Sequence, residues 1–456
     1  MSKRISMLCS LLLVVAMAFS AIGCGGAPAT EPTDGAQTSG DATATESTSA
    51  AEPVTLKFWD MAWGPAEAFP VESEKIIAKY TSEVAPHVTI EYTNLPWSNW
   101  YEQFSTAVAS NGAPDVCTGG GYMPFQFSTN DEMADLQWIV DEWKKEGTDK
   151  DFYEGMLDYW RFHDKQVGIP FNYDPRATFI RIDWLEEKGL EMPETYDDFI
   201  AVAKALTDKD QGIYGVAFGV TTGSAGPFMQ FATGNGGMCY NKDGTANVDN
   251  ERNLQVMKLF NTLQKDGSLP EGIVNYSGDD ADKLFMAGKA GISIRSAGGF
   301  NTYLNGGMTI DQVAVMPPLT SPSGTKNGQV NPNAYMMFEQ SQNKEEGMKF
   351  LKWYSENTYT IWTDGKQDGF PARISYLEGD EFKKPQRAQI IDRVLSNAVQ
   401  LVYPLQSGVP SASSVEGQKF DQTCMQAALT MDEDGWKDTL ATLQTQLEGL
   451  IADLDK

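Results

Sequence analysis

The chain has 456 residues, of which 41% are hydrophobic and 21% are charged, as in an ordinary soluble globular protein that is too long for one core. It carries 62 acidic residues against 35 basic ones, a formal net charge of -27. Such an excess repels nucleic acid and anionic lipid, which argues against a nucleic-acid-binding role. We attribute the acidic excess to solubility rather than to a cationic ligand.

The first residues predict a secretion signal and a lipid anchor. Two basic residues precede the apolar run 7–22, which is shorter than the roughly 20 residues that a membrane span needs. The run ends in Ala-Ile-Gly-Cys24, which resembles the lipobox of bacterial lipoproteins, with Ala21 where the motif favours Leu. The resemblance implies that residues 1–23 are removed and that the Cys24 sulfur takes a diacylglycerol. An ordinary signal peptide is the alternative.

Residues 24–53 are expected to form a disordered tether behind this lipidated cysteine. From residue 25 onward the segment has no aromatic residue, no Leu, Ile, Val or Met, and no Lys or Arg. Such a composition cannot bury apolar surface, so it stays unfolded. Long tethers of this kind suit the outer face of a Gram-positive cell membrane, which is where we expect the folded part to lie.

Strand and helix patterns alternate from Val54 onward. Residues 54–59 and 88–95 alternate apolar and polar side chains, as half-buried strands do. Residues 72–84 and 100–108 repeat apolar side chains at helical spacing. This order predicts an α/β lobe with a mainly parallel sheet.

The second half of the chain predicts further helices and a strand. Thr195 is a good helix N-cap, with Asp198 three residues later. Helical spacing recurs at 256–263 and over 436–454, and residues 290–294 read as a strand between them. No internal repeat and no second apolar span is present in the sequence.

The segment 168–184 reads as a strand with a polar interruption. Apolar residues on both sides flank Asn172, Asp174, Pro175 and Arg176. Strand interiors rarely carry charge without a function, because an unpaired buried charge is costly. The interruption therefore predicts a functional surface, with a local Asp174–Arg176 pair as the plainer alternative.

Motifs of common enzyme and metal sites are absent from the sequence. There is no phosphate-binding GxxxxGK[ST] motif and no CxxC pair. With only two histidines, neither HExxH nor a histidine-based triad can be assembled. The segment 241–244 predicts a tight turn rather than a calcium loop. Of the five cysteines, three remain for the folded part, and we expect free thiols or at most one disulfide among Cys117, Cys239 and Cys424.

Several blocks, in their order and spacing, resemble the extracellular solute-binding proteins of carbohydrate ABC importers, the family of maltose- and other oligosaccharide-binding proteins. The resemblance covers most of the chain from residue 54. Its blocks are GAPDV at 112–116, which in the family ends a strand at the cleft, then 168–199, 287–294, 316–318, 331–338 and 345–354. It implies an α/β, two-lobe periplasmic-binding-protein-like fold of type II, with a ligand cleft between lobes joined by multiple crossovers.

The resemblance also implies how the chain divides. Lobe 1 would comprise 54–173 and 334–372, and lobe 2 would comprise 174–333 and 373–456. The first crossing would lie at 172–176, with the two halves of the strand in different sheets and the interruption facing the cleft.

A sugar site needs aromatic faces for stacking and charged or amide groups for hydroxyls. By resemblance, the candidates are residues that follow strands at the cleft or lie in the crossing. For each aromatic candidate, core packing is the alternative. The candidates are Asp60, Trp63, Trp97, Tyr122, Asn172, Asp174, Arg176, Phe228, Arg295 and Phe300.

The implied function is a monomeric, non-catalytic receptor that closes on a sugar and presents it to the transmembrane subunits of a permease. No catalytic residue, metal or cofactor is expected. Two alternatives stay open. One is a surface-anchored glycoside hydrolase with two cleft carboxylates, since 62 acidic residues make their proximity uninformative. The other is a binding protein of the same fold for a polyamine or a metal ion.

Overall fold

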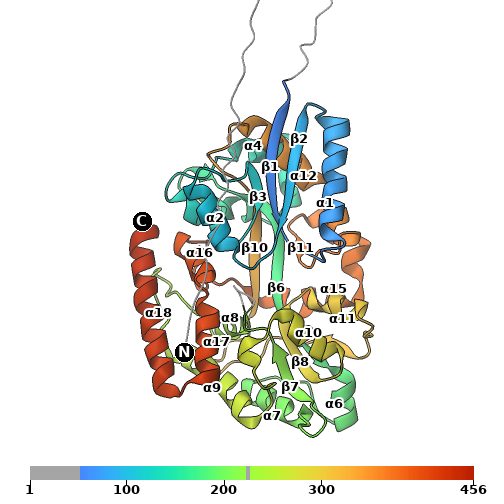
Figure 1. Cartoon of the computed structure of the whole chain (residues 1–456), viewed down its shortest axis with the longest axis vertical. Helices are drawn as coiled ribbons and strands as arrows, with labels where there is room; N and C mark the ends of the chain where they lie inside the picture. The colour runs from blue at the N-terminus through green and yellow to red at the C-terminus, as the bar shows by residue number, and fades with distance from the viewer. Residues whose placement is uncertain (1–51, 222–225) are drawn as a thin grey trace, which may run out of the picture. The chain divides into compact units, whose positions relative to one another are not determined.

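The computed structural model describes residues 52–221 and 226–456 (Figure 1). The expected signal peptide 1–23, the Cys24 lipidation site and the tether up to residue 51 lie outside the described residues. Within the described ranges, no helix is both long enough and apolar enough to cross a membrane.

Ten of the strands in the described ranges form one mixed sheet, with the order β2-β1-β3-β10-β6-β8-β7 (Figure 1). Strands β9 and β11 pair with β6, and β12 pairs with β10; β4 and β5 form a separate hairpin. The strands are β1 (Val54–Met61), β2 (Val88–Leu95), β3 (Val116–Thr118), β4 (Arg161–Phe162), β5 (Lys165–Gln166), β6 (Ile169–Arg181), β7 (Tyr214–Phe218), β8 (Ala290–Ser296), β9 (Val313–Val315), β10 (Gly328–Met337), β11 (Phe370–Pro371) and β12 (Ala398–Val399).

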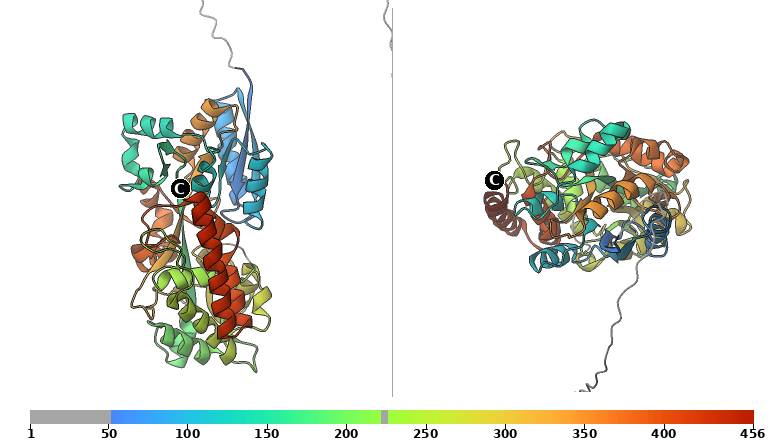
Figure 2. Two further views of the ribbon diagram at one scale, coloured as in Figure 1. Left: turned by 90° about the vertical axis from the view of Figure 1, so that its left-hand side faces the viewer. Right: turned by 90° about the horizontal axis from the view of Figure 1, so that it is seen from above.

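Helices surround this sheet, as the views in Figure 2 show. The α-helices are α1 (Phe69–Lys79), α2 (Trp100–Ala109), α3 (Met123–Ser128), α4 (Gln137–Glu146), α5 (Met156–Tyr159), α6 (Ile182–Lys188), α7 (Tyr196–Leu206), α8 (Pro227–Gly234), α9 (Glu251–Asp266), α10 (Gly278–Met286), α11 (Gly299–Asn305), α12 (Lys344–Asn357), α13 (Thr360–Thr363), α14 (Ile374–Leu377), α15 (Pro385–Arg393), α16 (Pro410–Gly417), α17 (Phe420–Thr430) and α18 (Glu433–Leu454). Short 3-10 or π turns are η1 (Tyr80–Val84), η2 (Thr148–Asp151), η3 (Ile273–Asn275), η4 (Asp380–Lys383) and η5 (Leu395–Asn397).

Lobe 1 is built around β1, β2 and β3, which are parallel to one another as the alternating sequence pattern predicts. The apolar side chains of β1, Leu56 and Phe58, are fully buried. The GAPDV motif leads into β3, whose first residue is Val116, so it begins this strand instead of ending one. The strand begins here because the Asp115 carboxylate accepts a hydrogen bond from the Lys57 backbone amide of β1 at 2.8 Å. This bond holds the start of β3 beside β1.

Lobe 2 is built around β7 and β8, which are also parallel. Helix α7 begins where the sequence predicts, because the Thr195 hydroxyl and the Asp198 amide and carboxylate form a complete capping box. The predicted turn at 241–244 is present, closed by an antiparallel bridge between Tyr240 and Ala246.

Strand β6 joins the two lobes without a break. Its first half pairs with β10 and β11, and its second half, from Arg176 onward, pairs with β8 and β9. The expectation that its halves lie in different sheets is therefore wrong. Pro175 does not interrupt the strand, since its fixed φ is compatible with extended backbone and Val330 of β10 lies opposite it.

The C-terminal segment packs against both lobes. Helix α16 contacts α3 and α2 of lobe 1 as well as α18. Helix α18 has the predicted amphipathic pattern, with Leu440 and Leu447 fully buried. It is the dark red helix that faces the viewer in the left-hand view of Figure 2. The exact lobe boundaries stay a prediction. The three cysteines of the described part are free and buried, as expected.

The capping box of α7 allows a test of how much the N-cap contributes to the stability of the protein. We expect Thr195→Ala to lower the free energy of unfolding by about 1 kcal/mol, because the Asp198 amide loses its acceptor. Urea denaturation measures this change. Thr442→Ala removes the same hydroxyl from an exposed position inside α18 and should cause no loss. Equal stability of the two variants would contradict a role for the cap.

Candidate functional site

A cavity of about 320 Å³ lies between the lobes, at the lower end of the roughly 300–1,000 Å³ that is usual for ligand pockets. Its walls come from the carboxyl ends of parallel strands in both lobes, which is where open α/β sheets bind ligands. In lobe 1, Trp63 follows β1, Trp97 follows β2 and Gly121 follows β3. In lobe 2, Gly219 follows β7, and Arg295 lies near the end of β8.

Two tryptophans form the aromatic wall of the cavity. The rings of Trp63 and Trp97 lie edge to face, with centroids 4.8 Å apart. The indole N–H of Trp63 donates to the Thr118 hydroxyl at 2.9 Å, and that of Trp97 donates to the Ala62 carbonyl at 2.9 Å. With both N–H groups already used, the indoles can offer a ligand only their carbon surfaces.

The crossing strands supply polar groups to the same cavity. On β6, the Arg176 guanidinium donates to the Asp174 carboxylate at 3.0 Å, and each side chain keeps 18% of its surface exposed. On β10, Asn331 and Asn333 line the cavity, and the Asn333 amide donates to the Asn172 carbonyl oxygen at 2.8 Å. The Asp174–Arg176 pair and the cavity surface, which the sequence left as alternatives, are thus both present.

Lobe 2 contributes a second ion pair. The Arg295 guanidinium contacts the carboxylate of Asp282 on α10. The Tyr303 hydroxyl donates to the other Asp282 oxygen at 2.9 Å. This network orients the arginine, whose side chain keeps 24% of its surface exposed. A guanidinium held in this way can donate to a ligand oxygen without first losing much side-chain freedom.

Two more carboxylates face the cavity from segments far away in the sequence. Burial raises the pKa of Asp368, which precedes β11, to about 6, although Arg295 and Arg387 oppose the shift. Burial raises the pKa of Glu416, on α16, to about 8, with Arg176 opposing it and Asp421 and Asp174 adding to it. At neutral pH, Glu416 is therefore mainly protonated and can donate a hydrogen bond as well as accept one.

Glycines keep the lobe 1 floor of the cavity close to the crossing strand. A Cβ at Gly121 would lie 2.2 Å from the Pro332 carbonyl oxygen of β10, which is backbone and cannot move aside. Only glycine allows β10 to pass so near the end of β3. The close approach brings Asn331 and Asn333 next to the tryptophan wall.

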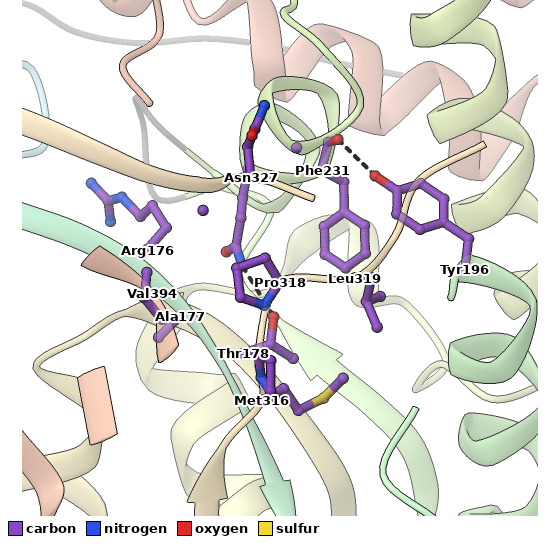
Figure 3. A pocket seen from close by; sticks show the side chains of 14 residues that line it. Arg176, Ala177, Thr178, Tyr196, Phe231, Met316, Pro318, Leu319, Asn327 and Val394 are labelled. Carbon is purple, nitrogen blue, oxygen red and sulfur yellow. Dashed lines mark hydrogen bonds between the residues drawn. The ribbon is translucent and has the colours of Figure 1, made fainter. Parts of the chain in front are cut away.

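A smaller hollow of about 40 Å³ lies beside the cavity and shares Arg176 with it (Figure 3). In this view the Arg176 guanidinium points away from Phe231 and Tyr196, whose hydroxyl donates to the Phe231 carbonyl at 2.8 Å. Since one water needs about 10–15 Å³ of such space, the hollow holds a few waters and no sugar ring.

The structure brings half of the predicted ligand-binding residues to the cavity wall and leaves the other half elsewhere. The residues that line it are Trp63, Trp97, Asp174, Arg176 and Arg295. The residues that do not line it, with their exposed fractions, are Asp60 (1%), Tyr122 (0%), Asn172 (1%), Phe228 (0%) and Phe300 (1%). Ligand contact stays a prediction for the first set.

The five residues away from the wall have packing or supporting contacts instead. The Asp60 carboxylate accepts a hydrogen bond from the Thr118 hydroxyl at 2.6 Å, which ties β1 to β3. Asn172 supports Asn333, as described above. Phe300 packs edge to face on Phe179, and Phe228 and Tyr122 belong to the hydrophobic core. Their side chains turn inward because strand and helix ends present alternate faces to the core.

Other lining residues were missed at the sequence level. Asn331 and Asn333 interrupt an apolar strand as the crossing residues of β6 do, so the same signal could have identified them. Asp282, Asp368 and Glu416 carry no comparable local signal, because tertiary packing alone brings their segments to the cavity.

Comparison with known proteins identifies the family that the blocks of the sequence resemble. Residues 68–361 match the family described as bacterial extracellular solute-binding protein. Binding proteins of Brucella abortus are 24% identical over 270 residues, which is 58% of this chain and 64% of theirs. The chain thus matches less than two thirds of the length of these curated relatives.

Solved structures extend the likeness over nearly the whole described fold. A sugar transporter protein from Arthrobacter chlorophenolicus A6 with bound laminaribiose has a TM-score of 0.77 at 25% identity, covering 87% of this chain and 99% of its own. A maltose-bound protein of T. maritima has a TM-score of 0.72 at 18% identity, covering 86% and 100%. The two-lobe fold is therefore that of periplasmic binding proteins.

The pH dependence of stability tests the buried Asp60 carboxylate, which links β1 to β3 beneath the cavity wall. Burial raises the pKa of Asp60 from 3.8 to about 7, although hydrogen bonds from Thr118 and Tyr92 oppose the shift. The unfolded chain therefore releases this proton at lower pH than the folded one. The contribution of Asp60 to the free energy of unfolding is largest below about pH 4. It decreases as the pH rises to about pH 7, by at most about 1.4 kcal/mol per pH unit.

The variant Asp60→Asn stays neutral at every pH, so we expect its stability relative to the natural protein to rise between about pH 4 and pH 7. Urea denaturation at pH 5 and pH 8 measures the difference. Asp364→Asn, at an exposed position, should show no such pH-dependent gain. A difference between Asp60→Asn and the natural protein that does not change with pH would contradict the raised pKa.

Proposed function

Because the chain belongs to the bacterial extracellular solute-binding protein family, we propose that it captures a sugar, in the first instance an oligosaccharide, in the cavity between its lobes. It then delivers the sugar to the transmembrane subunits of an ABC importer. The bound solutes of the similar structures, laminaribiose and maltose, support a carbohydrate for this chain as well.

The observation that carries the proposal is the composition of the cavity wall. Sugars have apolar C–H faces and a rim of hydroxyls, so they need flat carbon surfaces beside groups that donate and accept hydrogen bonds. Trp63 and Trp97 offer such surfaces with their N–H groups already bonded. Asp174, Arg176 and Asn331 stand beside them on the crossing strands.

Capture requires that the lobes move about the crossing strands. β6 and β10 each run from one lobe to the other, and β11 lies beside β6 at Asn172 and Tyr173. Hinge closure around a ligand at such crossings would bury the sugar and present one closed surface to the permease. A sugar that contacts both lobes would favour the closed form, because it gains contacts only there.

We further propose that the protein acts as a monomer on the outer face of a Gram-positive cell membrane. Removal of residues 1–23 would leave Cys24 as the lipidated first residue, and the segment 24–53 would tether the folded part. Relatives in the same family are binding proteins, which supports a receptor without catalytic residues or a cofactor. A tethered receptor would stay close to its permease.

The experiment for the receptor is a thermal-shift screen of the purified protein against mono- and oligosaccharides. A sugar that binds raises the melting temperature, by an amount equivalent to about 2.7 kcal/mol at one hundred times its dissociation constant. The same sugar must be recovered unchanged after long incubation. Steady release of a shorter product would instead support a hydrolase, and saturable binding of spermidine or ferric iron without any sugar response would support another solute class.

Loss of the Asp174 carboxylate should weaken sugar binding without unfolding the protein. For Asp174→Ala we expect a loss of about 1–3 kcal/mol, from one charge-assisted hydrogen bond, measured by isothermal titration. Asp183→Ala is the matched control, since it removes an Asp–Arg pair with Arg181 that does not line the cavity. Unaltered affinity in Asp174→Ala would remove the crossing from the site.

Loss of the Trp97 face tests the aromatic wall. We expect Trp97→Ala to weaken binding by about 1–2 kcal/mol and to reduce the fluorescence change on binding, because the sugar loses a stacking surface. Trp138→Ala is the control, since Trp138 is 40% exposed on α4 and lies outside the cavity lining. If both variants bind the sugar like the natural protein, the indole wall does not contact the sugar.

A further inference from the structure

The cavity carries more acidic than basic groups. Five carboxyl groups line it, on Asp174, Asp279, Asp282, Asp368 and Glu416. Only two guanidinium groups, those of Arg176 and Arg295, line the same space. This imbalance is local to the cavity and is separate from the net charge of the chain, most of which is carried by exposed residues.

The two guanidinium groups already have partners. Arg176 is bonded to Asp174 at 3.0 Å, and Arg295 contacts Asp282. Among the described residues, the other three carboxylates have neither a cation within 4.0 Å nor a hydrogen-bond donor on their side-chain oxygens. These three are Asp279, Asp368 and Glu416. The cavity wall therefore offers acceptors that the protein itself leaves without partners.

Two of these carboxyl groups interact electrostatically with Asp174, which lines the same cavity. The negative charge of Asp174 raises the pKa of Asp368 and that of Glu416, after the larger effect of burial, so it interacts with both. Glu416 is only 4% exposed, and its side chain lines the cavity. Asp174, Asp368 and Glu416 thus form one group of acidic side chains, which we call the acidic triad.

The position of Asp368 is held by close packing across the lobes. A Cβ at Gly298 would lie 1.9 Å from the Asp368 carboxylate carbon, so only glycine at that position leaves room for the side chain. The Asp368 backbone amide donates to the Trp63 carbonyl at 3.0 Å, and Arg387 donates to the Asp368 carbonyl at 2.8 Å. The backbone of Asp368 is therefore held in place, and its side chain lies against Gly298.

The raised pKa of Glu416 shows that its ionised form is costly without a partner, and a ligand cation would stabilise that form more than a neutral hydroxyl would. We propose that the solute is a sugar with a protonated amine, and that its ammonium group lies within the acidic triad. An ammonium group has three donors and no acceptor, which suits a cavity wall that carries several carboxyl groups. This inference rests on the proposed function, since it names the class of sugar that the same cavity takes.

The test compares sugars that differ only at carbon 2. Cellobiose, diacetylchitobiose and chitobiose share a β-1,4 linkage and carry a hydroxyl, an acetamide and an amine at that carbon; glucose, N-acetylglucosamine and glucosamine form the matching monosaccharide set. Isothermal titration near neutral pH keeps much of the amine protonated and leaves Asp368, whose pKa is about 6, mostly ionised. We expect the amine to bind about tenfold or more tighter than its neutral counterparts, with an advantage that shrinks as salt rises.

The possible results separate the two proposals. If a neutral sugar binds as tightly as its amine, the ammonium inference is overturned and the sugar receptor stands. If no sugar of either kind binds in these sets or in the wider screen, the receptor proposal fails and this inference fails with it. An amine without a sugar ring, such as spermidine, that binds as tightly as the amino sugar would also overturn it.

Charge-neutral variants of the triad give the second measurement. Glu416→Gln and Asp368→Asn keep the side-chain shape, and neither new side chain can take the negative charge that a bound ammonium group would favour. In each, we expect the ratio of amine to neutral affinity to fall at least threefold toward one. Asp380→Asn, whose side chain is 102% exposed, removes the same charge outside the cavity and should leave the ratio unchanged. An unchanged ratio in both triad variants would overturn the inference, and melting curves confirm that each variant is folded.

Discussion

One strand that changes partners half-way along its length organises this protein. β6 pairs with β10 up to Arg176 and with β11 at Asn172 and Tyr173, and it pairs with β8 and β9 from Arg176 onward. The backbone needs a hydrogen-bonded partner at every step, so strands of lobe 2 take over the pairing with β6 where strands of lobe 1 end, and one sheet continues through both lobes. The strand ends of both lobes then face each other, and the cavity lies between them.

This constraint explains why polar residues are tolerated in the middle of β6. Asn172 is paired with Asn333 on β10, and Asp174 is paired with Arg176 two residues on, where both side chains reach the same face of the strand. The cost of each polar group is offset by its neighbour. A continuous apolar strand here would be more stable as a core element, but it would leave the cavity with no hydrogen-bonding wall.

The sequence was informative wherever a signal was local. The alternation of β1 and β2, the capping box at Thr195 and the charges at Asp174 and Arg176 can each be read within a few residues, and each lies where it was predicted. The prediction that GAPDV ends a strand was wrong, because the motif alone does not show whether the strand lies before or after it.

Side-chain direction past the end of a strand or at the start of a helix cannot be read locally. Tyr122 and Phe228 lie in such positions and turn into the core, whereas Trp63 and Trp97 turn toward the cavity. Which way each ring turns depends on what packs against it from elsewhere in the chain. Asp368 and Glu416 reach the wall because β11 lies beside β6 and because α16 packs on α2 and α3. Only tertiary structure carries that information.

The two kinds of negative charge in this protein act over different distances. Charges on the exposed surface are screened within about 8–10 Å at physiological salt, so they favour solubility but hardly distinguish one solute from another. Carboxylates in a confined cavity are screened much less, and each one changes the protonation of its neighbours, as Asp174 does for Glu416. Under the proposed function, selectivity among sugars of similar shape would therefore rest on the few charges on the wall. Those charges come from β6, β8, α10, α16 and the segment before β11, so closing the lobes would change their spacing and would tie the choice of solute to the capturing motion.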